Sequence, residues 1–336
     1  MSTAIHGGDV FAVAEAYGFA PTELLDFSAN INPRGLPPSA ALRLQMDAAD
    51  ITGLTRYPDP HAWPLRRALS QLINVPPESI VVGEGAEALL GAAVRVFHPA
   101  TCFVPVPAFS EYARICSNLH PFALDPESNF QLDIQAAIES ECDLAIINNP
   151  HNPSGAFNTR EQLRPLFSSG KNVLLDEAFI DYVPHESLAC EAAQTPGVIV
   201  VRSLTKFYGC PSLRVGYAVA HPDVVENIRS LLPAWPVTQL ALNALTVAVQ
   251  DDEYRTTAIS DCIKHREQLA QALKRMDMKV FPSSANFLLL RLNAKWPDAS
   301  QLREQLITRH RILIRNCDSY SLLSKIGQGC DKACLE

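Results

Sequence analysis

Short apolar runs punctuate the middle of the chain, and each is continuous rather than alternating with polar residues. They lie at Ile80–Val82, Cys102–Val104, Leu144–Ile147, Val173–Leu175 and Val198–Val201. A continuous apolar run of this length is typical of a strand that is buried on both faces of a parallel sheet. Helical stretches separate the runs between about residues 80 and 220. The pattern therefore predicts an α/β fold with a mostly parallel sheet sandwiched by helices.

The pattern changes on both sides of this region. Before it, an amphipathic helix at Val10–Tyr17 precedes a short strand that begins at Leu25. After Pro233–Pro236, a long helical region leads to a strand, a helix and a further strand, which predict a smaller α/β domain. The expected divisions are an arm at 1–35, a large domain at 36–232, a small domain at 233–318 and an atypical tail at 319–336.

Composition narrows the class of protein. A chain of 336 residues is long enough to bury one large core and a second smaller one. The formal net charge of -8, without a dense run of Lys and Arg, argues against a nucleic-acid partner. No apolar stretch approaches the length of a membrane span, and the amino terminus lacks a signal-peptide pattern. The nine scattered cysteines form no C-x-x-C pair, so we expect a cytoplasmic protein with reduced thiols and no metal site.

The most informative segment, Ser203–Gly209, begins where the apolar run Val198–Val201 ends. Open α/β sheets bind ligands at the carboxyl ends of their strands. Desolvation at such a position lowers the pKa of an amine such as Lys206, and a neutral amine forms a Schiff base with an aldehyde. Ser203 and Arg214 are residue types that hold a phosphate. For the lysine alone, a surface position is the better interpretation, and the whole cluster favours a site.

Three other strand ends carry polar or aromatic residues. The glycine turn Gly83–Gly85 opens a helix whose free N–H groups suit an anion. The run at Leu144–Ile147 ends in N-N-P-H-N-P-S-G, where two Asn-Pro pairs favour an extended, irregular backbone. Asp176 ends another buried run and needs a cationic partner there.

Taken together, these motifs resemble a known enzyme family. The pattern S-x-x-K-x-x-G-x-x-x-L-R-x-G-Y starting at Ser203 resembles the cofactor-lysine segment of fold-type I pyridoxal-phosphate (PLP) enzymes. The N-P-x-N-P-[ST]-G loop, the R-Y-P-D motif at Arg56 and the H-G-G-D start at His6 extend the resemblance. The residues of these motifs are most similar to those of the branch that contains histidinol-phosphate aminotransferases and the threonine-phosphate decarboxylases of cobalamin biosynthesis. The resemblance covers about residues 5 to 318.

The resemblance implies a role for each cofactor residue. Lys206 would bind PLP covalently, Asp176 would pair with the pyridine nitrogen, and Asn152 would donate to the O3′ phenolate. Residues that would hold the phosphate or the ring are Gly85, Ala86, Glu87, Phe109, Ser203 and Arg214. Tyr57 would reach the phosphate of a partner subunit, which implies a homodimer. The carboxylate of Glu87 would repel phosphate unless it points away.

For the substrate, the resemblance implies an enclosing arm and one arginine. The substrate-binding residues would be His6, Gly8, Asn30, Asn152 and Arg315. The family continues with a strand of the form [FY]-[IV]-R-[VI]-[AS]-[VI]-R, whose first arginine grips the α-carboxylate. In this chain no arginine follows Arg315. We therefore expect the last strand and helix to be lost and the small domain to be truncated.

The implied activity is PLP-dependent decarboxylation of L-threonine O-3-phosphate to (R)-1-amino-2-propanol O-2-phosphate, with Lys206 and Asp176 as catalytic residues. Two alternatives stay open: a histidinol-phosphate-type aminotransferase, and a PLP-binding homologue with little activity because the terminal arginine is missing. Phe179 stands where aminotransferases commonly have Tyr, which decarboxylase-like sequences tolerate. The expected partners are a small phosphorylated amino acid and a second copy of the chain.

Overall fold

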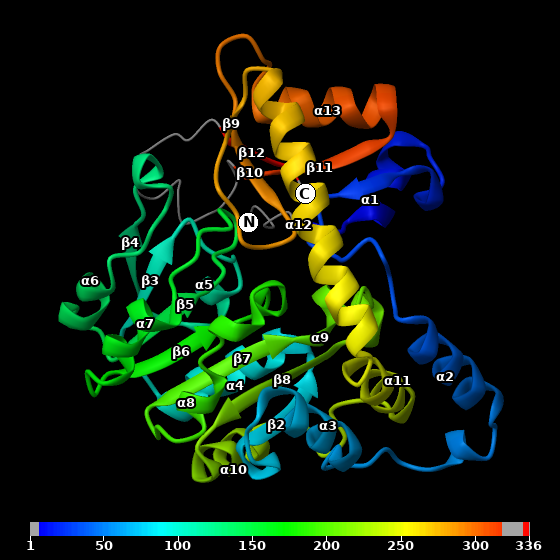
Figure 1. Ribbon diagram of the computed structural model, residues 1–336, viewed down its shortest axis with the longest axis vertical. Helices are drawn as coiled ribbons and strands as arrows, with labels where there is room; N and C mark the ends of the chain where they lie inside the picture. The colour runs from blue at the N-terminus through cyan, green and yellow to red at the C-terminus, as the bar shows by residue number, and fades with distance from the viewer. Residues whose placement is uncertain (1–6, 318–331, 336) are drawn as a thin grey trace.

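A computed structural model describes residues 7–317 and 332–335, and these residues form two sheets (Figure 1). The larger sheet has seven strands in the order β2-β8-β7-β6-β5-β3-β4. Its strands are β2 Ile80–Glu84, β3 Cys102–Val106, β4 Leu119–Ala123, β5 Leu144–Asn148, β6 Asn172–Asp176, β7 Val198–Ser203 and β8 Val215–Ala220. The pairs from β4 through β7 are parallel, and β8 is antiparallel to both neighbours. The predicted, mostly parallel α/β sheet is confirmed.

The continuous apolar runs arise because both faces of this sheet are buried. In β7, Val198 and Val200 pack into one core while Ile199 and Val201 pack into the other. Successive side chains of a strand point to opposite faces, so each run fills two cores at once. Helices α4 and α10 cover one face, and helices α3, α7, α8 and α11 cover the other.

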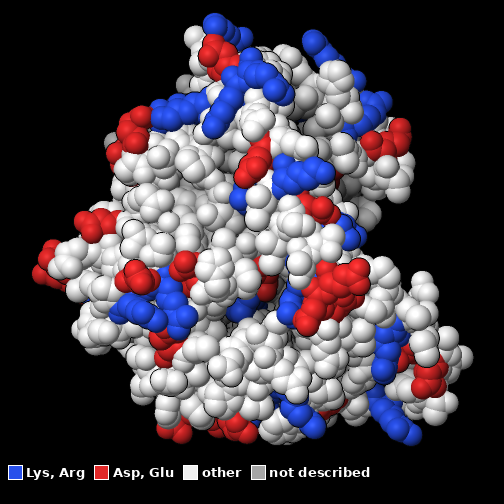
Figure 2. All heavy atoms as spheres, viewed as in Figure 1, with Lys and Arg blue, Asp and Glu red and all other residues white. Residues whose placement is uncertain are grey.

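The helices have the following bounds: α1 Val10–Tyr17, α2 Pro38–Ala49, α3 Trp63–Ile73, α4 Gly85–Phe97, α5 Tyr112–Ile115, α6 Ile134–Glu139, α7 Arg160–Phe167, α8 Ala189–Ala192, α9 Leu204–Phe207, α10 Pro222–Ser230, α11 Gln239–Val249, α12 Asp252–Arg275 and α13 Ala299–His310. Short 3-10 helices lie at Pro21–Glu23, Gly53–Thr55, Pro77–Ser79, Pro126–Ser128, Ile180–Tyr182, Pro184–Glu186 and Pro211–Leu213. Within the described ranges, no helix is long and apolar enough to cross a membrane. Acidic and basic side chains are interspersed on the face shown in Figure 2.

The smaller sheet has five strands in the order β1-β11-β12-β10-β9. Its strands are β1 Leu25–Phe27, β9 Lys279–Val280, β10 Leu288–Arg291, β11 Ile312–Asn316 and β12 Lys332–Leu335. β1 runs parallel to β11, and the other pairs are antiparallel. On one face of this sheet, Leu302 of α13 packs in a cluster with Ile314 of β11. In a second cluster, Val13 of α1 packs with Leu313 of β11. Figure 1 shows this sheet above the larger one, with α12 in front and spanning both.

Strand β12 corrects one expectation from the sequence, because the last strand is not lost. Lys332–Leu335 lies between β10 and β11, with Leu288 opposite Leu335 and Arg315 opposite Cys334. Strand pairing uses backbone N–H and C=O groups, which every residue except proline supplies, so a segment without the family's side-chain pattern can still form a strand. Within the expected tail, residues 319–331 and 336 lie outside the described part of the chain.

Candidate active site

A cavity of about 270 Å³ lies at the carboxyl ends of β5, β6 and β7, beside the start of α4. Most of the residues that the sequence singled out line it together. On the large-sheet side these are Gly85, Ala86, Glu87, Phe109, Asn152, Asp176, Ser203, Lys206 and Arg214. Asn30 from the arm and Arg315 from β11 line the opposite side. The topology explains this gathering, since parallel strands end at one edge of their sheet.

Lys206 lies in α9, one helical turn after the end of β7. Its backbone carbonyl accepts a hydrogen bond from the amide of Asn32 at 3.0 Å, which ties the arm to the lysine turn. Gly209 has a φ of 59°, and a Cβ there would lie 2.5 Å from the Cα of Gly35. Only glycine allows this approach, so the arm and the lysine turn hold one another in place.

An anion cradle forms where α4 begins against β8. Gly85 has a φ of 75°, and a Cβ on it would lie 3.0 Å from a guanidinium nitrogen of Arg214. A Cβ on Gly216 would lie 2.6 Å from the amide nitrogen of Ala86. The small residues therefore bring the free N–H groups of the helix start, the Arg214 side chain and β8 into close contact. Free helix N–H groups beside an arginine suit a phosphate.

Glu87, whose carboxylate would repel a phosphate, has a cation nearby. Its Oε1 lies 3.9 Å from Nη1 of Arg114, and about half of its side chain is exposed. Both side chains reach solvent, so the pair is weak, and it offsets part of the charge at the rim of the cavity.

Asp176 ends β6 with its side chain buried, at 3% exposure. Its Oδ2 accepts a hydrogen bond from the hydroxyl of Tyr112 at 2.6 Å, and its Oδ1 accepts one from the amide of Ala178 at 3.0 Å. Burial raises the pKa of the Asp176 carboxyl above its ordinary value, while these hydrogen bonds and the charge of Lys206 counteract part of the rise. A cationic partner in the cavity would therefore stabilise the ionised carboxylate.

Tyr112, which the sequence motifs did not indicate, is a further candidate site residue because it donates to Asp176. It opens α5 three residues after Phe109, and the two rings meet edge to face with centroids 5.7 Å apart. That three-residue spacing is the signal that indicates it, because residues three apart on a helical turn share one face. Phe109 thus lines the cavity while Tyr112 orients the acid below it.

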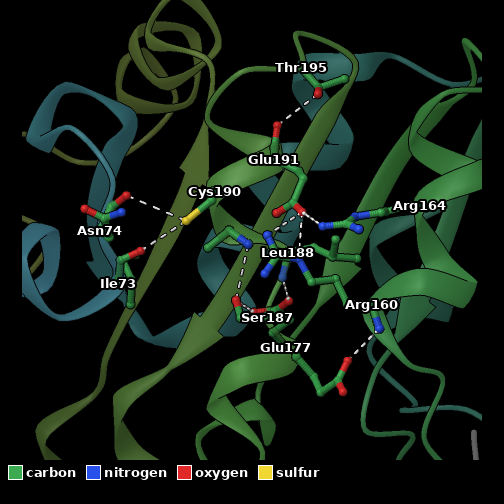
Figure 3. A network of polar contacts seen from close by, with 12 residues as sticks. Ile73, Asn74, Arg160, Arg164, Glu177, Ser187, Leu188, Cys190, Glu191 and Thr195 are labelled. Atoms are coloured by element: carbon green, nitrogen blue, oxygen red, sulfur yellow. Dashed lines mark hydrogen bonds and ion pairs between the residues drawn. The ribbon is translucent and has the colours of Figure 1, made fainter.

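The neighbouring acid, Glu177, points away from the cavity. Its carboxylate accepts hydrogen bonds from the hydroxyl of Ser187 at 2.6 Å and from the amide of Leu188 at 2.8 Å (Figure 3). Adjacent residues at a strand end project to opposite sides of the backbone, so one acid faces the ligand site and the other fixes the following loop. The same close view shows Glu191 taking Arg160 and Arg164 as partners.

The asparagine loop after β5 is held by side chain to backbone contacts. Asn148 accepts from the amide of Asn152 at 2.6 Å and donates to the carbonyl of Asp176 at 2.9 Å. His151 is buried, and burial lowers its pKa to about 4, so the ring is neutral near pH 7. Its Nε2 lies 2.8 Å from the carbonyl of Pro107, which joins this loop to the turn that carries Phe109. Asn148 was not predicted as a site residue from the sequence, because it is the last residue of its strand.

Among the described residues, two that the sequence predicted, Tyr57 and Gly8, do not line the cavity. Tyr57 is 77% exposed, and its ring stacks on Trp235 with centroids 4.3 Å apart. Gly8 donates its amide to the hydroxyl of Ser28 at 2.8 Å, next to Gly7, which does line the cavity. His6 lies outside the described residues. Among the residues that the structure describes, no group of His, Cys, Asp and Glu could hold a metal ion.

Comparison with known proteins agrees with this geometry. Residues 22–333 match the aminotransferase class I and II family. The threonine-phosphate decarboxylase of Salmonella typhimurium is 34% identical, over 94% of this chain and 88% of that protein. The histidinol-phosphate aminotransferase of Methanocaldococcus jannaschii is 30% identical, over 92% and 84%. The structure of histidinol-phosphate aminotransferase from Sinorhizobium meliloti in complex with pyridoxal-5′-phosphate superposes with a TM-score of 0.84 at 21% identity, covering 100% of this chain and 90% of that one. The chain therefore belongs to the aminotransferase class I and II family, whose enzymes use pyridoxal phosphate as cofactor.

Proposed function

We propose that this chain is a PLP-dependent decarboxylase that converts L-threonine O-3-phosphate to (R)-1-amino-2-propanol O-2-phosphate. The observation that carries the proposal is the two-sided cavity. An amine, a buried acid and a phosphate cradle lie on one side, and Arg315 lies across from them. The first set suits the cofactor, while Arg315 suits an anionic substrate. The 34% identity to a threonine-phosphate decarboxylase supports this substrate.

The donor set fits PLP at each of its functional groups. Lys206 supplies the amine for the aldehyde, and Asp176 supplies a buried carboxylate for the protonated pyridine nitrogen. The start of α4, Ser203 and Arg214 supply hydrogen-bond donors for the phosphate. Phe109 and Asn152 also line the cavity, and in this proposal Phe109 would contact the ring face and Asn152 would donate to the phenolate oxygen. When bound, PLP accepts the electron pair of a bond broken at the substrate Cα.

The protein's own residues then perform three tasks. Asp176 holds a proton at the pyridine nitrogen, and Tyr112 keeps its carboxylate oriented. Arg315 and the arm residue Asn30 bind the anionic groups of the substrate and exclude water. As the Cα–carboxylate bond breaks and CO2 leaves, Lys206 donates the proton that replaces it at Cα. The net result is that a proton replaces the carboxylate on Cα.

Bond orientation separates this reaction from transamination. Decarboxylation requires the Cα–carboxylate bond to stand perpendicular to the ring, whereas transamination requires the Cα–H bond there. A histidinol-phosphate aminotransferase is the second candidate, because a relative with that name is 30% identical to this chain. Phe179, which lines the cavity, favours the decarboxylase over aminotransferases with Tyr in that place.

The test measures both reactions on one preparation. Purified protein with PLP is assayed for CO2 release from L-threonine O-3-phosphate and for 2-oxoglutarate-dependent transamination of histidinol phosphate. The proposal expects CO2 release that Lys206→Ala abolishes. Transamination without CO2 release would establish the second candidate, and PLP binding without either reaction would indicate a homologue of little activity.

We also propose a homodimer in which Tyr57 reaches the cofactor site of the partner. Large apolar side chains are exposed on α2 and the turn after it: Leu42, Met46, Ile51, Leu54 and Tyr57. An apolar surface of this kind is typical of a protein–protein interface. Mixing Tyr57→Phe with Lys206→Ala protein should produce heterodimers with one repaired site, measured as regained activity. No regain despite subunit exchange would exclude the role across the interface.

The remaining divisions belong to the same proposal. We propose an arm at 1–35 that encloses the substrate, a large cofactor domain at 36–232 on which α11 also packs, and a small domain at 233–318 whose sheet includes β12. The arm's strand β1 pairs with β11 and Asn32 donates to the carbonyl of Lys206, so the arm connects the small sheet to the lysine turn.

A further inference from the structure

Far from the lysine, the small sheet meets the large body at one acidic residue. Glu127 lies in the 3-10 helix Pro126–Ser128, which follows β4 of the large sheet. Its carboxylate accepts hydrogen bonds from Nζ of Lys279 at 2.9 Å and from Nη1 of Arg291 at 2.6 Å. Lys279 belongs to β9 and Arg291 to β10, so one carboxylate bridges the two bodies through two cations.

The same two cations also cover an aromatic anchor. Lys279 and Arg291 lie over the ring of Phe281, at 5.1 Å and 5.5 Å from its centroid. Phe281 meets Phe130 of the large body edge to face at 5.0 Å, and both rings are about 1% exposed. We call Glu127, Lys279, Arg291 and Phe281 the bridging cluster. Its buried ring pair fixes the location of the contact, and its ion pairs orient the two strands around it.

Glu127 is ionised at neutral pH, so the bridge is charged under working conditions. The hydrogen bonds from Arg291 and Lys279 hold the pKa of its carboxyl at about 2. The side chain is largely exposed, at 66%, so solvent and salt weaken each pair. The strength of this contact between one carboxylate and two cations therefore depends on the salt concentration, and the contact is not a rigid link.

A continuous sheet connects the bridging cluster to the cavity. Arg291 is paired with Lys332 of β12, and β12 is paired with β11 at Arg315. Arg315 lines the cavity. Elsewhere, the small sheet also touches the large body: the amide of Ser284 donates to Gly155 at 2.9 Å, Phe287 meets Phe179 at 5.0 Å, and Leu289 and Cys317 lie in a core cluster shared with the large sheet. The contacts at Gly155 and Phe179 adjoin the catalytic side, whereas Glu127 holds the edge strand β9.

We propose that Glu127 is a positioning residue for substrate, acting through Arg315. The inference rests on the proposed function, because it assumes that Arg315 binds the substrate anion. A cation that binds the same anionic group before and during the reaction contributes equally to both states. Misplacing it therefore raises KM and leaves kcat unchanged.

The experiment compares two variants of Glu127 with a matched control. Glu127→Gln removes the charge and keeps the shape, while Glu127→Lys repels both partners. The control, Asp277→Asn, breaks the ion pair with Lys295, which is similarly exposed and joins only elements of the small sheet region. Asp277 has a φ of 64°, a conformation that asparagine tolerates, so the control preserves the backbone.

We expect KM for L-threonine O-3-phosphate to rise about threefold in Glu127→Gln and about tenfold in Glu127→Lys, with kcat within about twofold of wild type. Asp277→Asn should match wild type. Adding Lys279→Glu and Arg291→Glu to Glu127→Lys should recover most of the affinity. An unchanged KM in Glu127→Lys, or a loss in kcat with KM constant, would overturn the proposal.

A second measurement needs no substrate and separates this inference from the proposed function. Amide hydrogen exchange over residues 312–316 of the PLP-loaded protein should be faster in Glu127→Lys than in wild type and Asp277→Asn. Should wild type fail to release CO2, the proposed function is wrong and the exchange result still decides whether Glu127 holds β11. Equal exchange in all three proteins would overturn the positioning role.

Discussion

On the large-sheet side of the cavity, Asp176 and Lys206 come from the ends of the neighbouring strands β6 and β7, whereas Arg315 on the other side comes from the small sheet. The first two are fixed by short contacts within the large body, such as the 2.6 Å hydrogen bond from Tyr112. Arg315 belongs to a sheet that meets the large body at Glu127, Gly155 and Phe179 and through the buried Leu289 and Cys317. If the proposed roles hold, the chemistry would depend on contacts within one body and substrate recognition on contacts between two.

The largest effect should follow from removing the amine on the large-sheet side. Lys206→Ala should abolish the visible absorbance of the lysine-bound cofactor together with turnover, because Lys206 is the lysine that lines the cavity among the phosphate donors and Asp176. An absorption spectrum of the purified variant measures this directly. A visible spectrum identical to wild type would remove the basis for the cofactor assignment.

Asp176→Asn should reduce kcat at least about a thousandfold, or roughly 4 kcal/mol of transition-state stabilisation, while some cofactor stays bound. A neutral amide cannot hold the pyridine nitrogen protonated. The change keeps the size of the side chain, so the buried position is still filled. Steady-state rates at saturating PLP provide the measurement, and a variant within tenfold of wild type would show that this carboxylate does not act on the ring.

Substrate binding on the small-sheet side of the cavity should be open to improvement by mutation. Replacing residues 319–336 with an ending that restores R-[VI]-[AS]-[VI]-R should raise kcat/KM at least about tenfold, because a bidentate arginine adds both affinity and orientation for the carboxylate. β12 already occupies the place between β10 and β11, so the new strand has a position to fill. Rates of the two proteins are compared on threonine phosphate. Equal rates would mean that another residue already binds the carboxylate.

Tyr112→Phe should give the smallest effect, a loss of about tenfold in kcat, by removing one hydrogen bond to a charged group. The bond from Tyr112 lowers the pKa of Asp176 against the rise caused by burial, so its loss raises that pKa further. The acid limb of the kcat profile should therefore move to higher pH, whereas Tyr17→Phe, far from the cavity, should leave it in place. A profile that does not move would assign Tyr112 a packing role alone.

The sequence predicts the large-sheet side better than the small-sheet side for a physical reason. Continuous apolar runs identify buried strands, and polar residues at their ends, such as Asp176 and Lys206, then fall at one sheet edge. β12 was missed because its four residues, Lys332–Leu335, are too few and too mixed to form a continuous apolar run. Tyr112 and Glu127 were missed because each makes its contacts with residues distant in sequence, Asp176 in the first case and Arg291 in the second. The role of Tyr57 stays a prediction that concerns a second copy of the chain.

The parallel pairing of β1 with β11 also determines when the arm can fold during synthesis. Leu25 lies opposite Ile312, and the α1 residues Val13 and Ala14 bury themselves in the cluster that contains Ile307 and Leu313. At about 5–20 residues per second, a ribosome needs on the order of tens of seconds to make the chain between these partners. The apolar side chains of the nascent arm therefore stay exposed to water while the large sheet is synthesised. Over that time the arm's apolar side chains are available to chaperones or to other chains.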